Sequence, residues 1–356
     1  MVRRMALLVL LLGAGLLPAR PAAAAGAFGP PITVMTAPCP EAFVHADAAA
    51  GADGRIYGFA RFRGRGCNDR IWYFEGDGAS WTSQVTPYKG RILGVARGGG
   101  PTTYLLYSNG RNARITKRVG GTFSPGRAIG GVPGGGDVIA AGGTWWAVWR
   151  EGARRLKEAR TGGRSRPVPI AVGDFGKDNT SFLVSLAPRP GGGAVVAAEC
   201  CRKAGPDPYE DIGAIQVGVT ANGVWMPRFR FERNDAFEQP QAASSGRVTW
   251  LAWIRGSQVQ VTSNRSGSFA EHTFETGGWL SLRLAASGGR AFLAWDAAAS
   301  GPQVAFAEQS PDGTWTEARA SQVSANPQRL VAITAVDEKA TVLMMSPTRL
   351  YARTQT

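Results

Sequence analysis

The chain has 356 residues, of which 44% are hydrophobic, 19% are charged, 48 are glycine and 22 are proline. This apolar content suffices for a packed core and excludes bulk disorder, and the glycines and prolines favour short strands joined by tight turns. The formal net charge is +14, yet no block of consecutive basic residues of the kind that marks a nucleic-acid arm is present. We therefore expect one large all-β domain without a specific nucleic-acid partner.

Residues 1–25 have the pattern of a secretory signal peptide. Arg3 and Arg4 form a positive n-region, the apolar run from Leu7 to Leu17 is too short to span a bilayer comfortably, and Ala22–Ala25 offer small residues for cleavage. An uncleaved membrane anchor is the alternative. We expect an exported bacterial protein that has no transmembrane segment after cleavage.

Cleavage would leave residues 26–356 as a single domain with 37 basic and 26 acidic residues, a net charge of +11. Such a charge favours anionic partners such as acidic glycans and wall polymers. General solubility of an arginine-rich protein explains the same charge without any partner.

Seven short apolar or aromatic runs recur along the chain, each bounded by glycine or by charged residues. Runs of this length and composition predict strands and not helices. They are Arg55–Ala60, Thr103–Tyr107, Thr144–Trp149, Ala194–Ala198, Val248–Trp253, Ala291–Trp295 and Thr341–Met344. A further strand-like segment follows each run: Arg70–Phe74, Ala113–Thr116, Leu156–Ala159, Ala214–Val219, Gln258–Val261, Gln303–Ala307 and Arg349–Ala352.

Between these repeated pairs, a polar turn with glycine leads into an aromatic residue and an outer strand. The aromatic residues are Trp81, Phe123, Trp225, Phe269 and Trp315, and a weaker copy at Gly162–Ser165 lacks the aromatic. Positions 81, 123, 165, 225, 269 and 315 are separated by 42, 42, 60, 44 and 46 residues. Periods of roughly 40–50 residues are typical of β-propeller blades.

The seventh unit ends at Thr356 without an outer strand, which would leave a free sheet edge. The segment Ile32–Thr36, close behind the signal-like segment, offers the missing strand. Its pairing with Arg349–Ala352 would close the ring. We therefore predict a seven-bladed β-propeller of four-stranded blades, closed by an N-terminal strand that pairs with the C-terminal blade.

The long step of 60 residues contains two insertions in the fourth blade. Gly173–Asn179 precedes this blade, and Cys200–Asp211 joins its second and third strands. In a propeller both connections open on the same face, around the central channel. Long loops on a rigid scaffold commonly carry binding function, so we expect the ligand site there.

The turn Ser310-Pro311-Asp312-Gly313-Thr314-Trp315 resembles the Asp-box of the bacterial neuraminidase repeat, which is found in sialidase-like propellers. That box has a Ser or Thr, an Asp two residues later, then a Gly and an aromatic residue. Here the spacing from Gly to Trp is shorter, and the other copies keep little beyond the Gly and the aromatic. The resemblance implies the propeller fold and places these turns on the face opposite the site, but it does not imply the enzyme.

A sialidase-like site would need three arginines for a carboxylate, an acid/base residue, and a Tyr paired with a Glu. Arginine suits bidentate carboxylate binding, and paired acids can hydrolyse a glycosidic bond. The candidate ligand-binding residues near the ends of the second strands are Arg61, Arg150, Glu199, Arg202, Tyr209, Glu210, Asp211, Arg255 and Asp296. The family's Phe/Tyr-Arg-Ile-Pro motif is absent, and the Tyr and Glu come from one short loop. Two interpretations of these charged residues remain. They contact a ligand, or they are solvent-exposed groups at the ends of strands.

The four cysteines of an exported protein suggest disulfides. Cys39 and Cys67 should lie on the same face of the first blade, which predicts a Cys39–Cys67 bridge. Cys200 and Cys201 form either a vicinal disulfide or two buried or separately paired thiols. With two histidines and no paired spacing, we expect no metal site and no cofactor.

Together these patterns predict a secreted, monomeric propeller that binds a glycan or another anionic extracellular polymer at the channel mouth, without catalysis. The alternatives are a sialidase-like glycoside hydrolase and a structural or protein-interaction propeller of the cell envelope.

Overall fold

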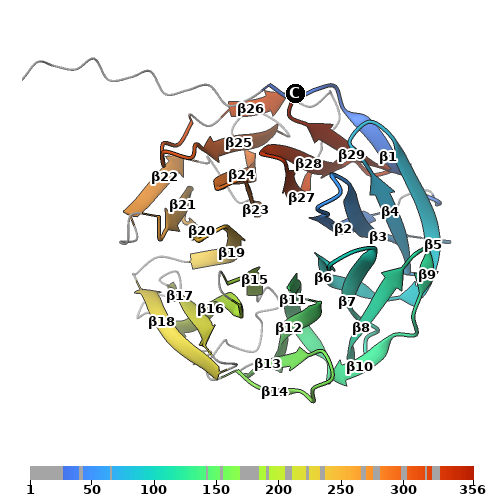
Figure 1. Ribbon diagram of the computed structural model, residues 1–356, viewed down its shortest axis with the longest axis horizontal. Helices are drawn as coiled ribbons and strands as arrows, with labels where there is room; N and C mark the ends of the chain where they lie inside the picture. Colours follow the sequence, from blue (N-terminus) through green and yellow to red (C-terminus); the bar gives the residue numbers. More distant parts are fainter. Residues whose placement is uncertain are drawn as a thin grey trace, which may run out of the picture.

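The computed structural model describes residues 27–39, 43–64, 66–141, 143–152, 155–168, 184–189, 192–204, 211–221, 224–232, 237–265, 270–275, 281–297, 303–316, 319–322 and 329–356. Seven antiparallel sheets stand around a central axis like the blades of a propeller (Figure 1). The seven-bladed fold predicted from the repeat is confirmed. Within these ranges no helix has the length and apolarity that a membrane crossing requires.

The strands of each blade run outward from the axis. The innermost strands are β2 (Phe43–Ala50), β6 (Arg91–Arg97), β11 (Pro133–Ala141), β15 (Val184–Pro188), β19 (Phe237–Ser245), β23 (Leu282–Ser287) and β27 (Arg329–Val336). The second strands are β3 (Ile56–Arg63), β7 (Thr102–Ser108), β12 (Thr144–Glu151), β16 (Ala194–Ala204), β20 (Val248–Arg255), β24 (Arg290–Ala297) and β28 (Lys339–Met345). The third strands are β4 (Arg70–Gly76), β8 (Ala113–Val119), β13 (Arg155–Arg160), β17 (Asp211–Ala221), β21 (Gln258–Ser263), β25 (Gln303–Gln309) and β29 (Arg349–Thr354).

The outer strands vary most between blades. They are β5 (Trp81–Lys89), β9 (Thr122–Phe123) with β10 (Arg127–Gly130), β14 (Arg166–Pro167), β18 (Val224–Glu232), β22 (Ala270–Glu275), β26 (Arg319–Gln322) and β1 (Ile32–Thr36). Every second and third strand overlaps the segment predicted for it, because those strands are apolar on both faces and give a strong signal.

Ring closure follows the predicted pairing. Strand β1 pairs antiparallel with β29, with Ile32 opposite Ala352 and Thr36 opposite Arg349. Val34 and Met35 of β1 are buried against the last and first blades. The Cys39–Cys67 disulfide is also present, with 5.6 Å between the Cα atoms, so the segment that follows β1 is covalently tied to blade one.

The connections between strands open on two opposite faces, because successive antiparallel strands reverse direction. The mouth face carries the connections between blades and those from each second strand to the third. The corner face carries the other connections, including the turns before the aromatic residues. Asp77 and Asp312 brace two of these turns, accepting hydrogen bonds from the backbone N–H groups of Ser80 (2.8 Å) and Thr314 (3.0 Å).

Two of the aromatic residues behind these turns pack on the preceding blade. The centre of the Phe123 ring lies 5.9 Å from that of Tyr73, and the centre of the Trp315 ring lies 5.6 Å from that of Phe274. These two corners therefore form apolar contacts between neighbouring blades. The outer strand expected directly after Trp315 is observed later, as β26, because Trp315 itself makes only an isolated bridge with Gln309.

Both ends of the second insertion predicted in blade four are strand, and residues 205–210 between them lie outside the described part of the chain. Cys200–Ala204 belong to β16 and Asp211 begins β17, so this hairpin has eleven residues in each arm. Pairing resumes after a bulge, with Lys203 opposite Ile212, because a continued ladder satisfies the backbone groups that a loop would leave open. The first insertion, Gly173–Asn179, lies outside the described residues.

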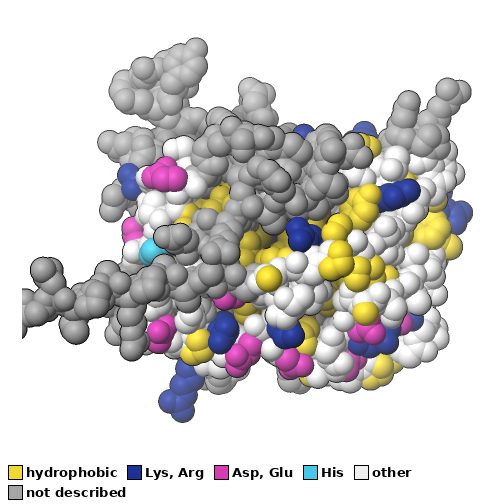
Figure 2. Space-filling view, turned by 90° about the horizontal axis from the view of Figure 1, so that it is seen from above, with side chains coloured by type: hydrophobic (Ala, Val, Ile, Leu, Met, Phe, Trp, Pro, Cys, Tyr) yellow, Lys and Arg dark blue, Asp and Glu magenta, His cyan; other side chains and the backbone are white. Residues whose placement is uncertain are grey.

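Charge is mixed on the rim of the ring. Figure 2 shows basic and acidic side chains interspersed over the described part of one side, without a patch of a single sign there. This mixed distribution agrees with a role of the net charge in solubility.

Deleting residues 26–36 should remove the closing strand and expose the edge of β29. Burial of Val34 and Met35 alone stabilises the fold by about 3–6 kcal/mol, so we expect a large drop in melting temperature and aggregation. Thermal unfolding with light scattering measures both. Replacing the exposed Thr33 and Thr36 by alanine is the control. An unchanged melting curve of the deletion would contradict the closure.

Replacing Cys39 and Cys67 together by serine should lower the free energy of unfolding by about 3 kcal/mol, since the bridge closes a 28-residue separation. Urea unfolding of the oxidised wild type and of the double variant gives the difference. The reduced wild type should match the variant; if oxidised and reduced protein unfold alike, the bridge contributes nothing to closure.

Candidate functional site

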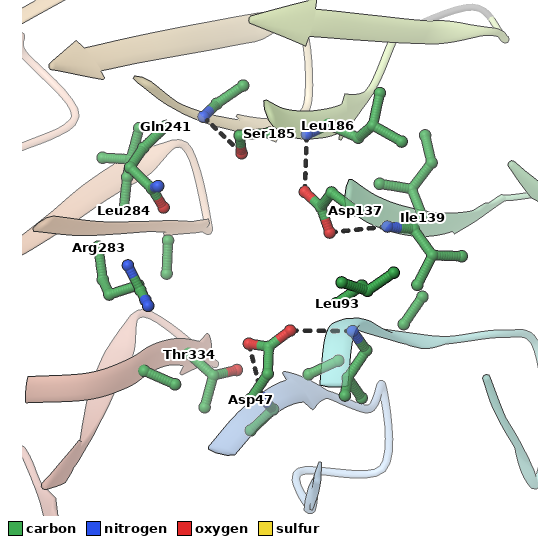
Figure 3. Close-up of a pocket in the computed structure, with 18 of the residues that line it drawn as sticks. Asp47, Leu93, Asp137, Ile139, Ser185, Leu186, Gln241, Arg283, Leu284 and Thr334 are labelled. Atoms are coloured by element: carbon green, nitrogen blue, oxygen red, sulfur yellow. Dashed lines mark hydrogen bonds between the residues drawn. The ribbon is translucent and has the colours of Figure 1, made fainter. Parts of the chain in front are cut away.

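The innermost strands enclose a cavity of about 960 Å³ that follows the axis of the ring (Figure 3). Most lining side chains are small or aliphatic, because seven strands crowd together there. Gly94 shows how tight the approach is: a Cβ atom at this position would lie 2.9 Å from the backbone nitrogen of Val138 on the next blade. The polar and charged lining residues are His45, Asp47, Arg91, Arg97, Asp137, Ser185, Glu199, Gln239, Gln241, Arg283 and Thr334.

Several of these side chains form a belt of hydrogen bonds between neighbouring blades. Adjacent innermost strands are not paired as a sheet, so their backbone groups at the axis need side-chain partners. Carboxylate, hydroxyl and amide oxygens accept bonds from N–H groups of the next blade: Asp47 from Val95 (2.9 Å), Asp137 from Leu186 (2.7 Å), Ser185 from Ala242 (3.1 Å) and Gln239 from Leu282 (2.9 Å). Guanidinium groups donate to carbonyls: Arg91 to Gly134 (2.7 Å) and Arg283 to Val331 (2.9 Å).

Asp47 and Asp137 both face the cavity from one side, and Arg283 lies across from them (Figure 3). Burial, together with the charge of Asp47, raises the pKa of Asp137 to about 7. Burial also raises the pKa of Asp47, although Arg283 opposes that shift. The wall therefore holds two carboxylates that interact with each other.

His45 lies nearer the mouth face on the same strand as Asp47. Burial, together with the charges of Arg283, Arg91 and Arg61, lowers the pKa of His45 to about 4. Its imidazole is therefore neutral at neutral pH. It lines the cavity as a residue of an innermost strand, and no group of three or more metal-binding side chains occurs in the described part of the chain.

The predicted site residues are only partly brought together. Glu199 lines the cavity, and its charge acts on the buried Arg150 on the neighbouring blade. Arg61 instead pairs with Asp69 at 2.8 Å. Asp296 accepts a hydrogen bond from the backbone of Leu330 at 2.6 Å, so it joins blades six and seven.

Three further candidates lie on the mouth side of their strands and are not among the residues that line the cavity. Arg255 ends β20, Arg202 lies in β16, and Asp211 begins β17. Tyr209 and Glu210 fall outside the described residues. The backbones of Cys200 and Cys201 lie in β16, and their vicinal disulfide stays a prediction.

Sequence reasoning missed the charged residues of the innermost strands as ligand candidates, above all Asp137, Arg91 and Arg283. A usable signal was present: Asp47 and Asp137 each stand alone in a run of small or aliphatic residues. A lone carboxylate in such a buried strand needs a structural or functional partner.

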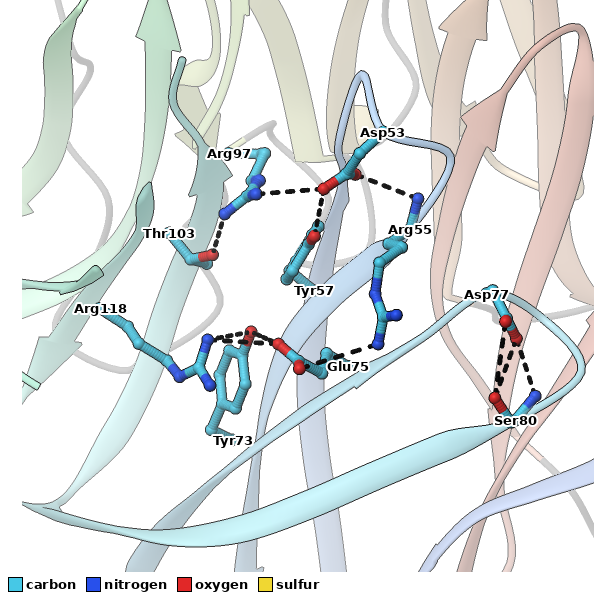
Figure 4. A network of polar contacts seen from close by, with 10 residues as sticks. All are labelled: Asp53, Arg55, Tyr57, Tyr73, Glu75, Asp77, Ser80, Arg97, Thr103 and Arg118. Atoms are coloured by element: carbon cyan, nitrogen blue, oxygen red, sulfur yellow. Dashed lines mark hydrogen bonds and ion pairs between the residues drawn. The ribbon is translucent and has the colours of Figure 1, made fainter. Parts of the chain in front are cut away.

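A second polar cluster lies on the corner face between blades one and two (Figure 4). The guanidinium of Arg97 stacks 3.7 Å from the Tyr57 ring centre, and that of Arg118 lies 4.1 Å from Tyr73. Tyr57 donates to Asp53, and Arg118 pairs with Glu75 at 3.2 Å. These contacts run between the two blades, so the cluster helps to join them.

Comparison with known proteins supports the fold. No protein-family model matches the chain, and no curated protein matches it. Among solved structures, YCF48 bound to D1 peptide is 15% identical, with 94% of this chain and 97% of that chain covered and a TM-score of 0.57. SapL1 lectin in complex with alpha methyl fucoside is 8% identical (83% and 100% covered, TM-score 0.54). The fucose-specific lectin from Aleuria aurantia is 11% identical (82% and 99% covered, TM-score 0.52).

At these identities the likeness shows the propeller fold alone. The resemblance of the turn at 310–315 to the Asp-box is not supported by a matching family model.

The pKa of Asp137 predicts how stability depends on pH. Because the folded-state pKa is about 7 and the ordinary value is 3.8, the folded protein binds this proton more tightly than the unfolded chain. The associated stability is fully present below about pH 4 and is lost as pH rises to about 7. The groups that face this carboxyl are Asp47, Ser185 and Arg283.

Urea unfolding between pH 4 and pH 8 measures this component in the wild type and in Asp137→Asn. The variant should lack it, so the difference between the two proteins should change across that range. A constant difference would show that Asp137 does not titrate there.

Proposed function

We propose that the protein binds a glycan or a comparable extracellular polymer at the mouth face of the channel, without catalysing a reaction. The observation that carries this proposal is the axial cavity of about 960 Å³, in which a few charged and amide groups project from an otherwise small and aliphatic wall. Ligand sites commonly combine such a concave apolar wall with a few fixed polar groups that orient the ligand.

The mouth face supplies the anion-binding side of the site. Arg150 and Glu199 meet there beside Arg91, whose guanidinium is held in place by the carbonyls of Pro133 (3.2 Å) and Gly134 (2.7 Å). Guanidinium groups held in this way bind carboxylates and hydroxyls at a small cost in side-chain entropy. The longer hairpin of β16 and β17 rises on the same face.

Sugars are the first ligands to test. Two of the compared propellers are fucose lectins, one of them with a fucoside bound. Export of the protein would bring it into contact with such ligands. The signal-like residues 1–25 and a disulfide, which persists in oxidising compartments, support export.

The glycoside hydrolase alternative has one observation in its favour, namely the raised pKa of Asp137 beside a second carboxylate. However, the oxygens of Asp137 accept backbone N–H bonds from Val138 and Leu186, and those of Asp47 accept such bonds from Ala48 and Val95. Carboxyl groups held in this way are poorly placed to give a proton to a leaving group. Binding is therefore the better-supported function.

A glycan array with the mature protein, beside a panel of fluorogenic glycosides, tests the proposal. Array binding without turnover supports it, and turnover would replace it with the hydrolase. Absence of all glycan binding would leave the protein-interaction alternative, for which the peptide-bound YCF48 structure is a precedent in this fold.

Arg150→Ala should weaken binding of an anionic glycan about ten- to a hundredfold, the value of one charge-assisted contact. Arg202→Ala should act in the same direction. Titration by fluorescence or calorimetry gives the affinities, and melting temperatures show whether each variant still folds. Arg55→Ala, on the corner face, is the charge-matched control. Loss of binding in the control but not in the other two would move the site to the opposite face.

A further inference from the structure

Two carboxylates on the cavity wall are not matched by a cation. Asp47 on β2 and Asp137 on β11 are separated by β6, which presents the aliphatic Leu93 between them (Figure 3). Within the described residues, neither carboxylate forms an ion pair within 4.0 Å. We call the space in front of Asp47, Leu93 and Asp137 the waist of the channel.

Arg283 faces the waist from across the cavity, and its guanidinium is held on that far side. Its Nε donates to the carbonyl of Val331 (2.9 Å) and its Nη1 to that of Leu282 (2.8 Å), on the far side of the cavity. Its charge influences both carboxylates across the channel without contacting them. The two carboxylates and Arg283 therefore lie on opposite sides of the cavity.

The negative charge at the waist exceeds what the blade junctions need. Ser185 and Gln239 make the same kind of bond to the next blade, to Ala242 (3.1 Å) and Leu282 (2.9 Å), with neutral oxygens. A neutral acceptor is therefore enough to join two blades in this ring. Asp47 and Asp137 accept such bonds as well, yet each adds a charge that burial disfavours.

The pKa shifts of Asp47 and Asp137 show that burial disfavours the charged form of both carboxyls. Burial raises the pKa of each carboxyl, and the charge of Asp47 raises that of Asp137. A cation placed between them would relieve burial and repulsion together. Strongly shifted carboxyls that line a cavity are typical of binding sites.

We propose that the waist binds the protonated amine of an amino sugar, with Asp47 and Asp137 as its two counter-ions. This inference rests on the proposed glycan-binding function and names its ligand class. An ammonium group has three N–H donors, and each carboxylate keeps free lone pairs beside its backbone bonds. Acetylation of the amine removes both the charge and two of these donors, so a free amine is required.

The remaining polar groups favour a sugar over the side chain of a lysine. Gln241 and Thr334 also face the cavity, from β19 and β27 (Figure 3). An amide and a hydroxyl at these positions match the hydroxyl groups of a sugar ring. An extended lysine side chain would bring no hydroxyl group to either of them, and it would fill little of a cavity of about 960 Å³.

The test compares a glucosamine oligosaccharide with its N-acetylated counterpart, using calorimetry on the mature full chain. The wild type should bind the free-amine form at least tenfold more tightly. The double variant Asp47→Asn/Asp137→Asn keeps an oxygen acceptor for each blade junction but loses both charges. It should lose this preference while still binding neutral sugars.

The control variant Asp77→Asn/Asp312→Asn removes two acidic charges from corner-face turns, and it should keep the wild-type preference. The single variants Asp47→Asn and Asp137→Asn keep the test valid if the double variant does not fold, and each should reduce the preference in part. Melting curves identify any variant that fails to fold.

Equal binding of both oligosaccharides by the wild type would overturn the inference and leave the proposed function intact. An unchanged preference in folded waist variants would overturn it as well. Binding of a lysine peptide but of neither oligosaccharide would overturn it in favour of a protein ligand. Failure to bind any glycan on an array would instead refute the proposed function from which it starts.

Discussion

The ring depends on how backbone groups are satisfied where the blades meet at the axis. Within a blade, antiparallel pairing satisfies them, but neighbouring innermost strands are not paired. The belt solves this problem with side chains, such as Asp137 to Leu186 and Arg283 to Val331. The same polar groups must then face the channel. The chemistry of the cavity is thus a direct result of how the blades are joined.

Farther from the axis, apolar contacts take over the joining of blades. Phe123 and Trp315 reach back to the preceding blade, and the stack of Arg118 on Tyr73 adds a polar version of the same contact. Hydrogen-bonded junctions between blades thus lie near the axis, and aromatic junctions lie farther out. Rigidity comes from the apolar outer contacts, and the hydrogen-bonding groups available to a ligand are concentrated near the axis.

The fold was predictable from sequence because the second and third strands are buried on both faces and recur at a near-constant spacing. The missing outer strand of the last unit also led to the prediction that Ile32–Thr36 pairs with that unit, and the structure confirms this pairing. The site was less predictable. Several innermost strands, such as β2 and β23, are rich in alanine because they crowd at the axis, and so they carry few of the β-branched residues that mark a strand. Asp137 was therefore not predicted as a site residue. Arg61 was predicted as one, although it pairs with Asp69.

The pairing of β1 with β29 also sets the order of events during biosynthesis. Ile32 is made 320 residues before its partner Ala352, so blade seven cannot be completed until nearly the whole chain has emerged. Until then β1 is an unpaired strand, and the first blade has no neighbour on one side. The early blades must remain soluble until the ring closes. An edge strand rich in polar residues, such as β5, favours this because it pairs less readily with other chains. The ring is therefore completed in a single late step.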